Sequence, residues 1–94
     1  MRDPFLERGE QLRQYLLKRE RSAAEHELFP LGYLIPQLEV VLDRAEYDPT
    51  TVSAHDFDAV CWQLVLNSSG EDGMSASDIA SLQRLWQAAC AIPA

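Results

Sequence analysis

With 94 residues, 47% hydrophobic and 24% charged, the chain is long enough for one domain with a single core and too short for two. Residues 1–21 carry six basic and four acidic side chains, whereas the remainder carries two basic and eleven acidic ones, which repel the phosphates of DNA and RNA. No apolar run reaches the roughly 18 residues of a membrane span, and MRDPFLERGE lacks the apolar stretch of a secretory signal. We expect one cytoplasmic domain over residues 1–94 that binds neither nucleic acid nor membrane.

The first predicted helix covers residues 4–20. Asp3 is suited to the N-cap and Pro4 to the first helical position, because an N–H in the opening turn has no partner within the helix. Gly9 lies on the apolar side at a cost of ~1 kcal/mol in helix propensity relative to alanine, so we expect another helix to approach it closely. The apolar side is formed by Phe5, Gly9, Leu12 and Leu16, flanked by Leu6 and Tyr15. The residues expected to face water are Glu7, Arg8, Glu10, Arg13 and Gln14.

The second predicted helix, residues 23–46, holds the longest nearly continuous apolar run of the chain, ELFPLGYLIPQLEVVLDRA. Two rows of apolar side chains repeat there at spacings of three and four, which predicts burial around more of the circumference than a surface helix needs. The wider row is Leu31, Leu34, Leu38, Val41, Leu42 and Ala45. The narrower row is Phe29, Tyr33, Pro36 and Val40. We therefore expect this helix to be central.

Two prolines inside this run predict an irregular helix, because proline removes one hydrogen bond and presses on the carbonyl four residues earlier. Pro36 presses on Gly32, which tolerates backbone adjustment, so we expect a kink there; the alternative places Pro36 in the first turn of a shorter helix. The capping-box pattern of Ser22 and Glu25 predicts that the helix begins just after it and is bent or interrupted at Pro30, in an opening turn.

The third predicted helix covers residues 53–67, after the acidic turn EYDPT, and opens on the capping-box pair Ser53 and Asp56. Its expected core face is Phe57, Val60, Cys61 and Leu64. Trp62 and Leu66 point away from that face. Either they are covered from a second side, or they form an exposed apolar patch.

The fourth predicted helix covers residues 76–91 and follows the polar turn NSSGEDGM, with Ser75 and Asp78 as a further capping pair. Its single apolar face is Ile79, Leu82, Leu85, Trp86, Ala89 and Cys90. Four amphipathic segments joined by short polar turns predict an all-α fold. We expect a small antiparallel four-helix bundle without a sheet, its second helix kinked or interrupted by Pro30/Pro36.

No arrangement of reactive side chains in the sequence predicts an enzyme. The HExxH motif of zinc proteases begins at His26, but Pro30 takes the place of the second histidine. His55 lies near several carboxylates, which are more simply explained as acidic side chains favoured at a helix N-terminus. Cys61 and Cys90 fall on apolar helix faces, so we expect buried, reduced thiols rather than a disulfide, a metal pair or a nucleophile. We therefore expect no catalytic residue, no metal and no cofactor.

The pattern ELFxxGYL at residues 27–34, together with the S, D, W arrangement of Ser75, Asp78 and Trp86, resembles the YfcL-like family of small, uncharacterised bacterial proteins. The first predicted helix and the acidic turn match that family more loosely than the rest of the chain. Pro30 and Pro36 depart from its pattern, which is a more regular helix at these positions. The resemblance implies an all-helical cytoplasmic protein and assigns no activity and no site residue.

These observations leave two hypotheses about function. The first is a non-enzymatic protein-interaction module whose partner is another protein, or a second copy of this chain in a homodimer. Its expected interaction residues are Phe29, Tyr33, Val40, Trp62 and Leu66. The acidic surface favours a basic partner, and added salt should weaken the binding of that partner. The alternative is a small-ligand-binding bundle, opened by the Pro36 kink and lined by Tyr33, Trp62 and Trp86.

Overall fold

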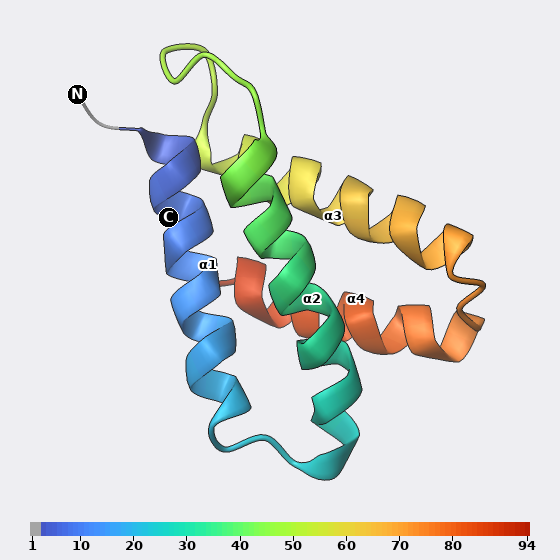
Figure 1. Cartoon of the computed structure of the whole chain (residues 1–94). Helices are drawn as coiled ribbons and strands as arrows, with labels where there is room; N and C mark the ends of the chain where they lie inside the picture. Colours follow the sequence, from blue (N-terminus) through green and yellow to red (C-terminus); the bar gives the residue numbers. More distant parts are fainter. Residues whose placement is uncertain (1–2) are drawn as a thin grey trace.

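Four helices account for most of the chain in the computed structural model, which describes residues 3–94. They are Pro4–Glu20 (α1), Glu25–Arg44 (α2), Ala54–Glu71 (α3) and Ala76–Cys90 (α4), and residues 3–94 contain no strand. The pair α1 and α2 forms one antiparallel hairpin, α3 and α4 form a second, and the two hairpins cross obliquely (Figure 1). The predicted all-α four-helix bundle is therefore confirmed.

Side-chain caps begin three of the four helices, as the sequence predicts. The Asp3 carboxylate accepts a hydrogen bond from the Leu6 amide at 2.9 Å, with Pro4 as the first residue of α1. Ser53 and Asp56 form a complete capping box at the start of α3. The Ser75 hydroxyl caps α4 by accepting the amide hydrogen of residue 78. Each cap satisfies a donor that the first turn leaves without a partner inside the helix.

The start of α2 differs from the prediction. Its N-cap is Ala24, which makes no side-chain capping bond, so the predicted capping box of Ser22 and Glu25 is wrong. The physical reason is that the turn ending α1 continues through these residues, with the Ser22 amide donating to the Arg19 carbonyl at 3.2 Å. The α2 helix therefore begins two residues later than expected.

Both prolines of α2 lie inside one uninterrupted helix. The predicted opening turn at Pro30 is wrong, because Pro30 is a buried residue within the helix. A proline there removes the hydrogen bond to the carbonyl of His26. Because His26 is exposed in the first turn of the helix, water can donate to that carbonyl instead. Pro36 and Gly32 are both exposed, and no atom outside the local backbone lies within 4 Å of a β-carbon built at Gly32. The helix therefore tolerates Pro36 on its solvent side.

The core lies where the two hairpins cross. Leu12 and Leu16 of α1 and Phe57 of α3 are completely buried. Gly9 lies close to two neighbouring helices, because a β-carbon there would lie 2.6 Å from Cε2 of Phe57 and closer still to a methyl group of Leu42 in α2, which confirms the expected close contact. Other fully buried apolar residues are Leu31, Leu34, Leu38, Cys61, Val65, Leu82 and Ala89.

The α3 helix is rotated about its axis relative to the predicted core face. Val60, expected in the core, is 46% exposed, whereas Val65 is fully buried. The buried positions recur every fourth residue, at Phe57, Cys61, Val65 and Ser69. This line faces both the first hairpin and α4, because α3 packs against all three other helices. Trp62 is half-buried at the edge of that line, and Trp86 is 5% exposed.

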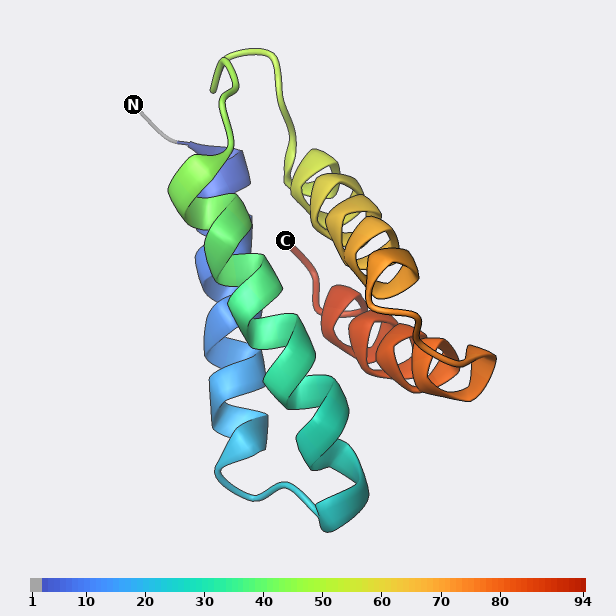
Figure 2. The same cartoon turned by 45° about the vertical axis from the view of Figure 1, so that its right-hand side comes forward.

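The α3 helix extends four residues beyond its predicted end at residue 67. Ser69 stays helical, with its hydroxyl donating to the Leu66 carbonyl at 3.0 Å. The chain reverses at Gly73, whose φ of 66° is a left-handed conformation that glycine adopts without strain. At the other end of α3, the connection from residue 45 to residue 53 arches over the start of α1 (Figure 2). In that connection Tyr47 donates its hydroxyl hydrogen to Asp3 at 2.7 Å.

Candidate interaction surfaces

The outward side of α2 carries a row of apolar side chains, here called the α2 stripe. It consists of Leu28, Phe29, Tyr33, Pro36 and Val40. Leu28 is 53% exposed, Phe29 46% and Val40 40%. Most of these residues recur at spacings of three and four, which the sequence revealed, whereas Leu28 was missed because it lies off that row. The structure therefore leaves a contiguous apolar surface on α2 facing solvent.

Tyr33 is the most firmly positioned member of the α2 stripe. Its hydroxyl donates to Oδ2 of Asp72 at 2.9 Å, and its ring centroid lies 6.4 Å from that of Phe29. Burial, and next the hydrogen bond to Asp72, raise the pKa of Tyr33 above its ordinary value. The phenol therefore stays neutral and keeps donating at neutral pH. This bond joins the stripe to the turn between α3 and α4.

The predicted interaction residues fall on two separate surfaces. Ser68 marks the side of α3 that faces α2, because its hydroxyl donates to Gln37 at 3.4 Å. Since each helical residue turns by about 100°, Trp62 and Leu66 lie roughly 120° and 160° around the α3 axis from Ser68. Phe29, Tyr33 and Val40 thus share the α2 stripe, whereas Trp62 and Leu66 belong to another side of the molecule.

The second surface, here called the α3 face, is the outward side of α3. Its exposed residues are Ala59, Val60, Gln63, Leu66, Asn67 and Gly70, with half-buried Trp62 at its edge. Val60 is 46% exposed and Leu66 38%. The Gln63 side chain donates to that of Asn67 at 3.0 Å. The whole face carries no charged residue.

Exposed carboxylates of α2 accompany the α2 stripe. They are Glu25, Glu39 and Asp43, and the one arginine of the helix, Arg44, lies 4.0 Å from Asp43. Glu39 receives a hydrogen bond from Arg13 of α1 at 3.4 Å, an exposed contact of little strength. The rim of the stripe is therefore acidic, and it complements a partner with lysine or arginine around an apolar centre.

A buried arginine is the residue that the sequence placed wrongly. Arg8 was expected to face water but is only 3% exposed. Its guanidinium donates to both carboxylate oxygens of Asp58 at 2.9 and 3.0 Å, and to the side-chain oxygen of Gln11 at 2.7 Å. It also donates to the carbonyl of Cys90, the last residue of α4, at 3.0 Å and to that of Ile92 at 2.6 Å. The spacing of Arg8 from Phe5 and Leu12 placed it on the inward side of α1, a signal that its charge obscured.

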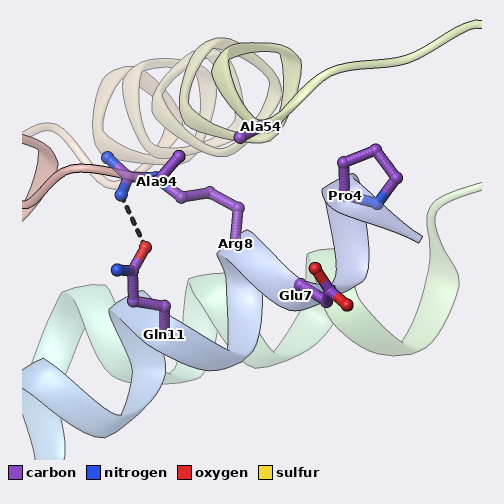
Figure 3. A pocket seen from close by; sticks show the side chains of 6 residues that line it. All are labelled: Pro4, Glu7, Arg8, Gln11, Ala54 and Ala94. Atoms are coloured by element: carbon purple, nitrogen blue, oxygen red, sulfur yellow. Dashed lines mark hydrogen bonds between the residues drawn. The ribbon is translucent and has the colours of Figure 1, made fainter. Parts of the chain in front are cut away.

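A cavity of about 460 Å³ opens beside Arg8, between α1, the start of α3 and the end of the chain. It is lined by Pro4, Glu7, Arg8, Gln11, Ala54 and Ala94 (Figure 3). All five N–H groups of the Arg8 guanidinium already have acceptors within the protein, and Asp58 balances its charge. Arg8 therefore holds the helices together and offers no donor to an anionic ligand.

The residues of the predicted ligand pocket lie apart from the three cavities of the structure given below. Trp86 packs in the core, Tyr33 bonds to Asp72, and Trp62 lies at the edge of the α3 face. Cavities of about 460, 250 and 230 Å³ are present, and Tyr33, Trp62 and Trp86 line none of these three. The sequence could not reveal this, because it does not specify how α3 is rotated against α2.

Burial and spacing describe the thiols and acidic side chains of residues 3–94. Burial raises the pKa of Cys61 to about 12, and that of Cys90 likewise to about 12, so both remain protonated at neutral pH. Between residues 3 and 94 no three His, Cys, Asp or Glu side chains are grouped so that they could hold a metal ion.

Comparisons with protein-family models, with curated proteins and with solved structures found no match for this chain. The resemblance to the YfcL-like family therefore stays a prediction from the sequence. Across residues 3–94, no helix combines the length and the apolar character needed to cross a membrane.

Proposed function

We propose that this protein is a non-enzymatic interaction module whose α2 stripe binds another protein. The observation that carries the proposal is the exposure of Phe29 and Val40 in one row on α2, with exposed Leu28 beside that row. Large apolar side chains scattered singly on a surface need no explanation, but a row of them marks a binding site. Tyr33, held by Asp72, adds an aromatic side chain with little rotational freedom left to lose.

The partner is expected to combine an apolar contact with a basic rim. The apolar part supplies the lasting contact, because burying Phe29 and its neighbours removes apolar area from water. The acidic rim of Glu25, Glu39 and Asp43 speeds the encounter with lysine and arginine side chains. Free DNA or RNA is not the partner, because eleven carboxylates beyond residue 21 repel phosphates.

We further propose that the protein works in the cytoplasm. The support is that Cys61 and Cys90 are both free thiols, which suits a reducing compartment. The sequence resemblance to the YfcL-like family points the same way and supplies no activity.

A pull-down with matched variants tests the proposed surface. Wild-type protein, Phe29→Ser and Leu66→Ser are immobilised separately and exposed to a lysate of the source organism. A genuine partner is captured by the wild type and by Leu66→Ser, and its affinity for Phe29→Ser falls by about ten- to a hundredfold. Both substitutions remove an exposed apolar side chain, so Leu66→Ser controls for non-specific binding through exposed apolar residues.

Salt dependence gives a second readout on the purified complex. Raising NaCl should weaken the complex, because the encounter depends on attraction between opposite charges. The proposal fails if every captured protein binds Phe29→Ser as well as the wild type. It also fails if labelled RNA or DNA binds tightly at physiological salt.

A further inference from the structure

We infer that the cavity of about 250 Å³ between α1, α2 and α4 is a binding site for the phosphate group of a small molecule. Each of the three helices contributes a side chain with N–H donors to its lining, namely Arg19 of α1, His26 of α2 and Arg84 of α4. The other lining residues are Glu27, Pro30, Ser81, Leu85 and Ala88. This lining shares no residue with the α2 stripe, so the inference does not rest on the function proposed for the stripe.

Arg84 brings a positive charge without a carboxylate partner into this cavity. Beyond residue 21 the chain has two basic side chains, Arg44 and Arg84, against eleven acidic ones. Arg44 lies 4.0 Å from Asp43, whereas Arg84 forms no ion pair with any carboxylate of residues 3–94. Its guanidinium donates to the Ser81 hydroxyl at 3.2 Å, which orients it and leaves most of its five N–H groups for a ligand.

Arg19 is the second arginine of the cavity, and it too keeps donors for a ligand. Its Nε donates to Glu27 at 2.8 Å and its Nη1 to the Tyr15 hydroxyl at 2.9 Å, so two contacts hold the side chain in place. The other oxygen of Glu27 lies 4.0 Å from Nε2 of His26. The planar fork of donors on each arginine matches the oxygens of a phosphate group.

The lining favours a small phosphate over other anions. Its two arginines and one glutamate give a local formal charge of +1, in a chain whose net charge is −7. Donors arrive from three helices, and a phosphate presents three acceptor oxygens in different directions, whereas a carboxylate presents two in one plane. The cavity is smaller than the roughly 300–1,000 Å³ pockets of drug-sized ligands. Pro30 and Leu85 are buried, so an apolar group on the phosphate can rest against them.

Titration of the isotope-labelled whole chain with inorganic phosphate, followed by NMR at constant ionic strength and neutral pH, tests the inference. The amides of residues 26–30 and 81–88 should shift saturably with a Kd of about 1–10 mM, a weak affinity because the acidic chain opposes any anion. Phenyl phosphate should bind roughly threefold to tenfold more tightly, because its ring covers Pro30 and Leu85. Malonate, a dianion with two flat carboxylates, should bind about tenfold more weakly than inorganic phosphate.

Matched charge variants locate the site. Arg84→Gln should weaken phosphate binding by about tenfold or more, because a charged donor to the anion is lost. Arg44→Gln removes the same charge from the far end of α2 and should change the Kd less than about twofold. Glu27→Gln removes the negative charge of the lining and should tighten binding by roughly threefold to tenfold. Arg44 and Arg84 are both exposed, and circular dichroism verifies that each variant keeps its helices.

Three results overturn the inference. The first is the absence of saturable shifts at these amides up to about 50 mM phosphate. The second is an equal loss of affinity in Arg84→Gln and Arg44→Gln, which would mean that phosphate responds only to the net charge of the chain. The third is malonate binding as tightly as phosphate, which would mean that the donors do not select a tetrahedral anion.

Discussion

Arg8 and Asp58, fifty residues apart in the sequence, form a two-pronged ion pair at 2.9 and 3.0 Å. The arginine side chain is 2% exposed and that of the aspartate 17%. The same guanidinium also binds the carbonyls of Cys90 and Ile92, so a single side chain of α1 joins α3 to the end of α4. The hydrogen bond to Asp58 raises the pKa of Arg8, which keeps the guanidinium charged.

Removing Arg8 should destabilise the fold more than removing any other basic residue. In Arg8→Met the Asp58 carboxylate and two carbonyls lose their donors, and leaving one partner of a buried ion pair costs about 3–5 kcal/mol. Arg13→Met is the matched control, because its contact with Glu39 is exposed, and it should cost less than about 1 kcal/mol. Urea unfolding measures both free energies of unfolding. Equal values would show that the Arg8 network does not hold the helices together.

Alanine at Gly9, which is buried, and alanine at Gly32, which is exposed, should change the free energy of unfolding in opposite directions. In Gly9→Ala the new methyl group meets the Phe57 ring, and overpacking costs about 1–3 kcal/mol, more than the helix propensity gained. In Gly32→Ala the methyl group meets nothing, so the fold should gain about 0.5–1 kcal/mol. Thermal unfolding followed by circular dichroism reads both changes. A stabilised Gly9→Ala variant would contradict the close contact between α1 and α3.

Apolar spacing predicted most of the fold because it is a local property of each helix. The spacing of Leu12 three residues after Gly9, and of Leu16 four residues after Leu12, identified the buried side of α1. No knowledge of the neighbouring helices was needed. The caps at Asp3 and Ser53 were likewise readable, since a cap involves residues only three apart. These features need no tertiary information.

What the sequence did not reveal depends on how helices lie against one another. Arg8 looked like a surface residue because its partner Asp58 is distant in the chain, and nothing local places the two together. Val60 was assigned to the core because the spacing from Phe57 fits a helix, but the packing of α3 against the other helices buries Val65 and leaves Val60 exposed. Trp62 and Leu66 lie away from the α2 stripe, and how far apart the two sets of interaction residues lie also depends on how α3 packs.

The two tryptophans should differ in their contribution to stability. Trp86 is 5% exposed in the core, so Trp86→Ala should cost about 3–5 kcal/mol. Trp62 is half-buried at the edge of the α3 face, so Trp62→Ala should cost less than about 2 kcal/mol in the monomer. The measurement is urea unfolding at low protein concentration. Equal and large losses would mean that Trp62 is covered from both sides.

The buried thiol of Cys61 should make the fold sensitive to alkaline pH. Burial raises its pKa from 9.0 to about 12, so in the folded protein the neutral thiol is retained while the unfolded chain ionises. The stabilisation is complete below pH 9 and is lost as the pH rises from 9 toward 12, by up to about 1.4 kcal/mol per pH unit for one group. The same loss of stability at alkaline pH is expected from three other groups with raised pKa values, Cys90, Tyr33 and Tyr47. The pH dependence of wild-type stability therefore does not by itself identify the contribution of Cys61.

Cys61→Ala isolates the contribution of this thiol. The variant has lower stability at pH 7 because a buried group is lost, but between pH 8.5 and 10 its stability should fall less steeply than that of the wild type. Cys90→Ala should flatten the slope as well, because the pKa of Cys90 is also raised to about 12. Free energies of unfolding in urea at several pH values give the slopes. Parallel curves for wild type and Cys61→Ala would show that the thiol ionises as easily in the folded protein as in the unfolded chain, and that the core around it admits water.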